Sequence, residues 1–321
     1  MKQHITRHYN SFDINKTKGI ITKISSNEKL RDEIEYYKSI SDNNSIYFPR
    51  YMGSNYDGEN YALDLEYYCY KNLGDFMIYE PFDLRFWEKT SESIQDMMES
   101  FSQNSKTGNY NSIVDSMYVN KTEHYYKELV DGFKLFTSMS KFDTVYFNGV
   151  AYLNFENIWD DVKKKIESFD ELDSLGMIHG DFCFSNILCG VSEKINVPVL
   201  RCVDPRGSFG EQGIYGDRRY DLAKLMHSYQ GGYEYIIYDE FKIEKDGWPG
   251  AMRFDSSFSN QNLNKIEDVF KSNSYFYTPE IKLLQGLIFI GMCSRHYDSL
   301  DRQTLMYLQG IKFLNEALND E

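Results

Sequence analysis

The chain has 321 residues, enough for roughly two domains, and its 41% hydrophobic and 26% charged residues are ordinary for a globular protein. Its formal net charge of −14 argues against nucleic acid or an anionic membrane surface as a partner, and it is compatible with a cationic or neutral substrate. The longest apolar run is too short to span a bilayer, no apolar signal region opens the sequence, and the five cysteines form no CxxC pair, so we expect a cytoplasmic protein with free thiols.

The first 70 residues predict a small sheet with one helix. β-Branched and apolar residues favour strands over 5–12, 19–24, 46–52 and 61–67. Ser26 or Asn27 can cap a helix over 28–40, whose apolar residues recur at helical spacing. The segment 11–19 has one glycine, at its end, and could be an ordinary hairpin turn. We therefore expect an N-terminal lobe over residues 1–70.

From residue 71 onward the pattern is mainly helical, which predicts a C-terminal lobe over 71–321. Apolar residues at helical spacing favour helices over 82–101, 111–137, 154–174, 219–230, 233–244, 261–272, 279–294 and 300–319. Tyr233, Tyr235, Tyr238 and Trp248 could line a substrate pocket. Aromatic residues at such spacing belong more often to the core, and we favour the core.

A polar loop interrupts the C-terminal lobe at residues 177–188, with an apolar pair on either side. It contains His179 and Asp181 around a glycine, and Asn186 follows Asp181 by five positions. An aspartate here can take a proton from an attacking hydroxyl, and an asparagine can give its amide oxygen to a magnesium ion. Both residue types also serve as turn residues that bond the nearby backbone. Cys183 has no adjacent base and is predicted to pack against the loop.

Two further segments follow this loop. The β-branched run 197–203 predicts a strand that ends at Asp204, and the proline after this aspartate stiffens the turn. The segment 216–225 begins a helix that Asp217 can cap, with Asp221 in its first turns. We expect a structural and not a chemical role for Asp221.

The three motifs resemble those of the kinase superfamily in order and spacing. His-x-Asp followed five positions later by Asn is the spacing of its catalytic loop, and Gly180, where protein kinases usually have Arg, resembles the aminoglycoside phosphotransferases and choline kinases. The segment 216–223 is similar to the Gly-Asp-Pro-x-x-Asp-Leu-Ala segment of the former. More narrowly, the motifs look like a bacterial subgroup associated with capsule or surface-polysaccharide genes. The resemblance implies an α+β, protein-kinase-like two-lobe fold, with a small antiparallel-sheet N-lobe and a larger, mainly helical C-lobe.

The resemblance implies a role for each motif residue with ATP, or alternatively GTP, and Mg²⁺. Asp181 would be the catalytic base, and Asn186 and Asp204 would hold the metal. Phosphoryl transfer needs little covalent help from a protein, so positioning and charge neutralisation should dominate.

The resemblance also implies a lysine in the N-terminal sheet that contacts the α- and β-phosphates. Lys23 lies in the second predicted strand and matches it, although a solvated strand lysine would have the same sequence context. Glu33 would pair with Lys23. Glu35 is the alternative, about 200° round the helix from Glu33, so only one of the two can point inward.

The other expected nucleotide contacts come from the N-terminal lobe. In the absence of a glycine-rich loop, phosphate contacts would come from backbone N–H groups and from Ser11, Asn15 or Thr17. The adenine ring would bond backbone groups of the segment that includes Glu66 and Tyr68.

By resemblance, the reaction would be transfer of a γ-phosphoryl group to an alcohol on a small molecule, with a sugar, a sugar derivative or an amino alcohol as acceptor. Arg206 is the better-placed candidate to contact a phosphate or an anionic acceptor. His296 and Asp298 are further candidates, although a helix C-terminus explains His296 equally well. Phe184 stands where aminoglycoside kinases usually have proline, so the substrate of the resistance enzymes is not carried over. The sequence leaves the oligomeric state open.

Three other classes of protein are alternatives. A catalytically silent nucleotide-binding scaffold would usually lack one of Lys23, Asp181, Asn186 or Asp204, and all four are present. A protein kinase would need a longer segment than 205–218 to recognise a peptide. A structural or interaction protein would not bind Mg-ATP.

Overall fold

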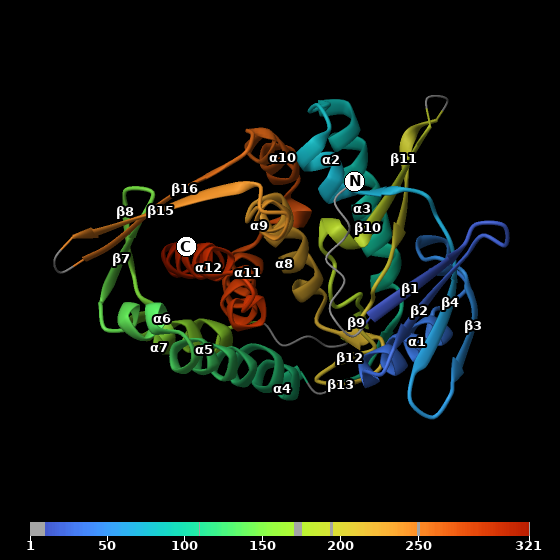
Figure 1. Cartoon of the computed structure of the whole chain (residues 1–321), viewed down its shortest axis with the longest axis horizontal. Helices are drawn as coiled ribbons and strands as arrows, with labels where there is room; N and C mark the ends of the chain where they lie inside the picture. Colours follow the sequence, from blue (N-terminus) through green and yellow to red (C-terminus); the bar gives the residue numbers. More distant parts are fainter. Residues whose placement is uncertain (1–9, 109, 170–174, 193–194, 249–250, 321) are drawn as a thin grey trace.

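The structure is a computed structural model of the chain, and it describes residues 10–108, 110–169, 175–192, 195–248 and 251–320. Figure 1 shows a small lobe of strands at one end, in blue, and a larger, mainly helical lobe that makes up the rest of the molecule. This is the α+β, two-lobe architecture that the sequence predicts. Among the described residues, no helix is long and apolar enough to cross a membrane.

The small lobe is a four-stranded antiparallel sheet in the order β1-β2-β4-β3. Its strands are β1 (Asn10–Asn15), β2 (Ile20–Ser25), β3 (Tyr51–Tyr56) and β4 (Tyr61–Glu66). The predicted strand over 46–52 is wrong at its start, because a 3-10 helix, η1 (Ser45–Tyr47), occupies it. Pro49, which cannot donate to a ladder, then delays the strand to Tyr51. Residues 5–9 of the first predicted strand lie outside the described residues.

Helix α1 (Glu28–Ser39) packs against β2, β3 and β4 of this sheet. Asn27 caps it, because its side-chain oxygen accepts a hydrogen bond from the backbone N–H two residues on, at 2.9 Å. The buried residues of the helix are Leu30, Glu33, Ile34, Tyr36 and Tyr37. Burial of this face fixes the helix, and Glu33 with it, against the sheet.

The connection between the lobes runs through residues 67–70. The next strand, β5 (Lys71–Asn72), no longer belongs to the first sheet, since it pairs with β10 (Ile187–Ser192). That strand pairs in turn with β11 (Ile195–Cys202). We propose the domain boundary at 67–70 for this reason.

Helices form most of the large lobe. Its longer helices are α3 (Leu84–Ser102), α5 (Lys121–Gly132), α7 (Phe155–Glu167), α8 (Arg218–Tyr229), α10 (Asn262–Lys271), α11 (Pro279–Cys293) and α12 (Leu300–Asn319). Its shorter helical segments are α2 (Leu73–Tyr79), α4 (Tyr110–Ile113), the π-helix η2 (Val114–Asn120), α6 (Lys134–Met139), η3 (Phe184–Asn186), α9 (Tyr233–Ile237), η4 (Ser274–Phe276) and η5 (Ser294–His296). Every residue of α8 from Tyr220 to Tyr229 is buried, so α8 is the central helix, and α11 packs against it.

Short strands pair around the loops of this lobe. They are β6 (Ser105–Lys106), β9 (Leu175–Met177) and β14 (Tyr215–Gly216) in one sheet, and β12 (Ser208–Phe209) with β13 (Glu211–Gln212) in another.

A four-stranded sheet lies at the end of the large lobe farthest from the small lobe (Figure 1). It has the order β15-β16-β7-β8, with β7 (Thr144–Phe147), β8 (Val150–Leu153), β15 (Phe241–Trp248) and β16 (Ala251–Phe258). The predicted helix over 233–244 is therefore wrong after Ile237. Phe241 and Ile243 alternate with exposed polar residues, and a period of two suits a strand and not a helix. Residues 170–174, predicted to end the helix over 154–174, lie outside the described residues.

Candidate active site

The loop that carries His179 and Asp181 lies between two strands, with β9 leading in and β10 leading out. Gly180 has φ +78°, and a Cβ on it would lie 3.0 Å from Cβ of Arg206. Only glycine meets both conditions without strain, since other residues rarely adopt this φ. The glycine therefore allows a tight turn directly beside Arg206.

Asp221, in the first turn of α8, holds this loop in shape. Its carboxylate accepts hydrogen bonds from the backbone N–H groups of His179 at 2.5 Å and Gly180 at 2.8 Å. Burial raises the pKa of Asp221 to about 7, although both N–H groups act in the opposite direction. These contacts are those of a structural residue. Asp217 caps α8 as predicted, since it accepts a hydrogen bond from the backbone N–H of Arg219 at 2.9 Å.

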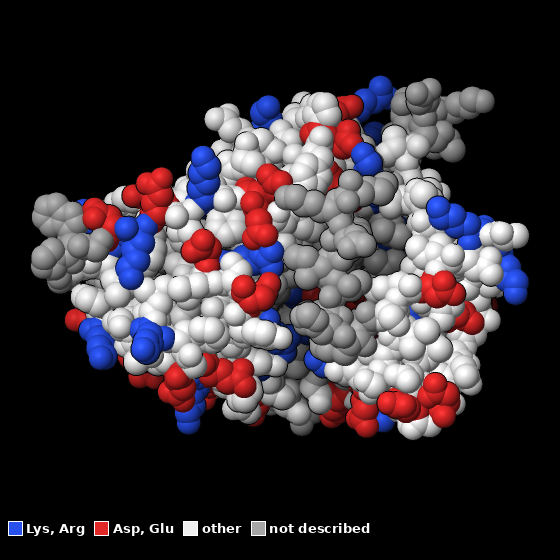
Figure 2. Space-filling model, in the orientation of Figure 1, with Lys and Arg blue, Asp and Glu red and all other residues white. Residues whose placement is uncertain are grey.

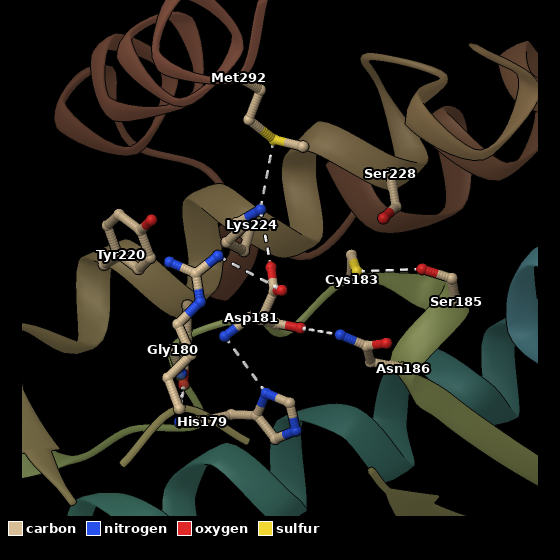
Figure 3. A network of polar contacts seen from close by, with 12 residues as sticks. His179, Gly180, Asp181, Cys183, Ser185, Asn186, Tyr220, Lys224, Ser228 and Met292 are labelled. Atoms are coloured by element: carbon tan, nitrogen blue, oxygen red, sulfur yellow. Dashed lines mark hydrogen bonds and ion pairs between the residues drawn. The ribbon is translucent and has the colours of Figure 1, made fainter. Parts of the chain in front are cut away.

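Asp181 lies between the cationic side chains of Lys224 and Arg206. Figure 3 shows Lys224 pointing toward the carboxylate of Asp181. One carboxylate oxygen is 2.8 Å from Nζ of Lys224, and the other is 3.4 Å from a guanidinium nitrogen of Arg206. Burial alone would raise the pKa of Asp181, but Lys224 and Arg206 hold it well below its usual range. Asp181 is therefore a carboxylate at neutral pH and can accept a hydrogen bond from a hydroxyl group.

Asn186 and Asp204 lie at the same end of the β10–β11 pair. The Asn186 amide nitrogen donates to the carbonyl oxygen of Asp181 at 2.9 Å, which leaves the amide oxygen as the atom that can bind a cation. The backbone N–H of Val203 donates to the carbonyl of Asn186 at 2.9 Å, so Asp204 follows directly beside it. Asp204 has φ +59°, which is uncommon outside glycine, and its side chain is half exposed. Such backbone conformations cluster at functional sites.

Lys23 connects the small lobe to this site. Its Nζ lies 2.6 Å from a carboxylate oxygen of Glu33 and also contacts Asp204. Burial disfavours the charged lysine, but the two carboxylates outweigh this and raise the pKa of Lys23, while burial raises the pKa of Glu33 to about 7 against the effect of Lys23. Glu35 pairs instead with Lys38 at 2.8 Å, so Glu33 is the partner of Lys23. Two neighbouring elements of the small lobe and Asp204, 181 positions after Lys23, thus meet at one ammonium group.

The segment after Asp204 packs directly on α1. A Cβ on Gly207 would lie only 1.8 Å from the backbone carbonyl oxygen of Asp32, so this approach requires glycine. The contact fixes α1, and hence Glu33, relative to Asp204.

The oxygen atoms of Asp204 and Asn186 form a donor set that fits Mg²⁺. This ion prefers oxygen ligands and keeps several waters, so one carboxylate, one amide oxygen and the phosphates of a nucleotide suffice. In the part of the chain that the structure describes, no group of three or more His, Cys, Asp or Glu could hold a metal by itself. A metal at this site would therefore take some of its ligands from the protein and the others from the nucleotide phosphates and water.

Comparison with known proteins gives matches in structure and not in sequence. No protein-family model matches the chain, and a search of curated proteins gives no match. Among solved structures, a thermostable mutant of the aminoglycoside phosphotransferase APH(4)-Ia in its apo form covers 98% of this chain and 94% of its own, with a TM-score of 0.61 at 10% identity. The GDP complex of wild-type aminoglycoside 2'-phosphotransferase-IIIa covers 98% and 90%, with a TM-score of 0.53 at 12% identity. This chain has the aminoglycoside phosphotransferase fold.

Within this aminoglycoside phosphotransferase fold, the connection between the lobes offers fewer backbone donors than the sequence predicts. The N–H of Glu66 donates to the carbonyl of Arg50 at 2.9 Å, and the N–H of Tyr67 donates to that of Gly19 at 2.8 Å. The Tyr68 hydroxyl donates to the Glu66 carboxylate at 2.9 Å. The Glu66 N–H is thus used inside the small lobe, and the backbone of Tyr68 is the better candidate to bond adenine.

The structure does not bring Ser11 to Lys23, which corrects the expected phosphate contact. Ser11 pairs across the ladder with Ile24, the neighbour of Lys23, so its side chain projects from the opposite face of the sheet. The turn at 16–19 lies at the other end of β2, about 13 Å from Lys23 at roughly 3.3 Å per residue. Asn15 accepts a hydrogen bond from an N–H inside this turn at 3.0 Å. The segment is therefore an ordinary hairpin turn.

Of the predicted acceptor contacts, Arg206 contacts Asp181 directly, and the other two contact other side chains. Asp298 forms an ion pair with an arginine of α12 at 3.0 Å. His296 packs edge-on against a tyrosine ring, with centroids 6.4 Å apart. Neither residue lines the pocket between α8 and α11, whereas the neighbouring Arg295 does.

Lys224 is the functional candidate that the motif analysis missed. It lies on α8, its side chain is 2% exposed, and its ammonium group reaches Asp181. Lysines are almost never fully buried unless they are paired, so a lysine inside a helix that is apolar around it signals an ion partner. The partner itself comes from a loop more than 40 positions earlier, which periodicity cannot reveal.

The residues assigned to packing are buried. Cys183 is 2% exposed, and burial raises the pKa of its thiol, which disfavours the thiolate form that a nucleophilic cysteine uses. Tyr233 and Tyr235 belong to the core, and Tyr238 is partly buried against it. The side chain of Trp248 lies outside the described part of the chain.

Proposed function

We propose that this chain transfers the γ-phosphoryl group of ATP, or alternatively GTP, to a hydroxyl group of a small molecule. The observation that carries the proposal is the meeting of Lys23, Glu33 and Asp204 at one point. Beside it lie an ionised Asp181 and the amide of Asn186. These side chains are the parts that phosphoryl transfer requires: phosphate contacts, metal ligands and a base near the acceptor.

Asp181 would accept the hydrogen bond of the acceptor hydroxyl and take its proton as the new oxygen–phosphorus bond forms. Because its pKa is low, Asp181 acts mainly by orienting the hydroxyl. Lys23, held by Glu33, would neutralise charge on the α- and β-phosphates. Mg²⁺ on Asn186 and Asp204 would supply further neutralisation of the charge that develops on the phosphates.

The structural neighbours support a nucleotide donor and a small-molecule acceptor. One is a ternary complex of APH(4)-Ia with ADP and hygromycin B, which covers 92% of this chain with a TM-score of 0.57 at 10% identity. Likeness at this identity shows the fold, so hygromycin B is not carried over to this chain. We propose a sugar, a sugar derivative or an amino alcohol as the acceptor, and a cytoplasmic role in surface-polysaccharide synthesis. The motif resemblance supports this proposal.

The charge distribution gives no reason to expect nucleic acid as a partner. On the face shown in Figure 2, the described Lys and Arg side chains are interspersed with Asp and Glu and form no continuous basic track. The net charge of −14 also argues against nucleic acid as a partner.

An ATP-consumption screen tests the proposed function. The full chain with Mg-ATP is offered sugars, amino sugars, sugar acids, sugar phosphates, choline-like alcohols and nucleosides, and we expect one class to stimulate consumption. The Asp181→Asn variant should lose this stimulation while Mg-ATP still raises its melting temperature. Near-normal turnover by this variant would refute the role of Asp181. Absence of any Mg-ATP effect on the melting of the wild-type chain would favour a structural or interaction protein.

A further inference from the structure

A pocket lies between η2, α5, α8 and α11. Its cavity volume is about 20 Å³, room for about one water molecule, so a larger ligand enters only if the side chains that line it move. Its lining includes both cationic partners of Asp181, so the pocket and this carboxylate share two neighbours, Arg206 and Lys224. Leu287 and Met292 of α11 contribute to an apolar wall on one side.

The lining of this pocket is strongly cationic. Among the residues that the structure describes, the lining includes no Asp or Glu, and its four cationic side chains are Lys121, Arg206, Lys224 and Arg295. Arg206 and Lys224 share the single carboxylate of Asp181. At least two positive charges in the lining are therefore not offset by that carboxylate.

Among the described residues, Lys121 and Arg295 contact tyrosines and no carboxylate. Nζ of Lys121 lies 3.3 Å from the hydroxyl of Tyr220 and 5.2 Å from the centre of its ring. Arg295 donates to the hydroxyl of Tyr125, and its guanidinium lies 4.4 Å from the centre of that ring. Both cations are partly buried, and charges removed from water are usually paired with a counter-ion. Two such cations facing one pocket indicate that the counter-ion is a ligand.

The pKa shifts of Lys121 and Tyr220 agree with a positive potential in the pocket. Burial lowers the pKa of Lys121 to about 8, and Arg206 and Arg295 add to this effect while Tyr220 opposes it. Burial would raise the pKa of Tyr220, but Lys121, Arg206 and Lys224 lower it to about 8. A bound anion would relieve the repulsion between these cations.

We infer that the acceptor is a hydroxy compound that also carries an anionic group, a carboxylate or a phosphate, which Lys121 and Arg295 bind while the hydroxyl lies at Asp181. This inference rests on the proposed function and narrows its substrate class. An aminated acceptor such as an amino sugar or a choline-like alcohol would place its positive charge among these cations. The expectation of a cationic or neutral substrate, drawn from net charge, is thus replaced by the local charge at the site.

The test compares acceptors that share one carbon skeleton. The full chain with Mg-ATP is given glucose, glucosamine, glucuronate or glucose 6-phosphate, and a parallel set is built on glycerol, with serinol, glycerate and glycerol 3-phosphate. Binding of each compound is measured by calorimetry beside turnover, so a skeleton that binds without reacting still counts. We expect the anionic members to bind at least about 10-fold more tightly than the neutral member of their set, and the two anions separate a carboxylate site from a phosphate site. Equal or tighter binding of the neutral or aminated members in both sets overturns the inference, as does the absence of any binding.

Variants of the two cations locate the effect. Lys121→Met and Arg295→Met should each weaken binding of the preferred anion about 10- to 100-fold, the effect of removing a charged hydrogen-bond partner. The matched control is Lys127→Met, because Lys127 lies on the same helix with an exposed side chain. Anion affinity unchanged in both pocket variants overturns the inference.

The affinity for Mg-ATP separates this inference from the proposed function. If Lys121→Met and Arg295→Met weaken Mg-ATP binding as much as anion binding, the cations serve the nucleotide and the inference is wrong. If the wild-type protein does not bind Mg-ATP, the proposed function is wrong, irrespective of how tightly the anionic compounds bind. If Mg-ATP binds and only a neutral acceptor is phosphorylated, the proposed function stands and the inference falls.

Discussion

Replacing Lys224 with methionine removes the charge nearest to Asp181 while nearly keeping the length of the side chain. Nζ of Lys224 lies 2.8 Å from a carboxylate oxygen of Asp181, and the lysine is 2% exposed. Two unit charges at this distance interact by about 6 kcal/mol at an effective dielectric constant of about 20. Asp181 is 23% exposed and keeps Arg206 at 3.4 Å, so solvent and the second cation absorb part of the loss.

We expect Lys224→Met to move the acid limb of the pH profile of kcat/KM upward by about 1 to 3 pH units, the usual effect of one opposite charge on a carboxyl group. Asp181 acts as a carboxylate, and its pKa in the wild-type protein lies well below the usual range. Removal of the lysine raises this pKa, so activity is lost as the pH falls through the raised value. Profiles are recorded for the wild type, Lys224→Met and Lys224→Arg, and the arginine variant, which keeps the charge, should retain the wild-type limb. An unmoved acid limb in a folded Lys224→Met protein would refute the assignment of Asp181 as a base kept ionised by Lys224.

Three further predictions concern the surroundings of Asp181. Asp204→Ala should weaken Mg²⁺-dependent nucleotide binding at least about 10-fold, because loss of a residue that only bonds a metal ligand already costs about that much. Unchanged nucleotide affinity in a titration would count against the metal role of Asp204. Asp221→Ala leaves two buried N–H groups without an acceptor and should lower the free energy of unfolding by about 2 to 6 kcal/mol in urea; a loss below about 1 kcal/mol would contradict the structural role. Gly207→Ala forces α1 away from Asp204 and should lower the free energy of unfolding by about 1 to 3 kcal/mol and weaken nucleotide binding. Gly53→Ala is the control, because a Cβ there meets nothing within 4 Å, and it should be nearly neutral in both measurements. Equal behaviour of the two variants would refute the close approach of Gly207 to α1.

Local motifs in the sequence predict the parts of the site that depend on the chain nearby. The loop with Asp181 and Asn186, the strand that ends at Asp204 and the cap at Asp217 are each set by residues within a few positions. Helix geometry predicts that only one of Glu33 and Glu35 can face the sheet, and the structure identifies Glu33 as that residue.

Contacts between distant segments escape such patterns. Lys224 reaches Asp181 because α8 is buried against the loop, and nothing in the spacing of the motif specifies that contact. The cations of the pocket between α8 and α11 come from η5, α5 and α8 and the segment after Asp204, so only the fold assembles them. Ser11 was misplaced because the strand register decides which face of the sheet a side chain occupies, and one residue of offset reverses it.

Phosphorus NMR of a reaction with Mg-ATP and the acceptor selected by the screen tests the central claim most directly. The account predicts that the wild-type chain yields ADP together with a new phosphate ester on the acceptor in equal amounts, and that Asp181→Asn yields neither at a comparable rate. Release of inorganic phosphate without the ester, or an ester formed equally fast by Asp181→Asn, would contradict it.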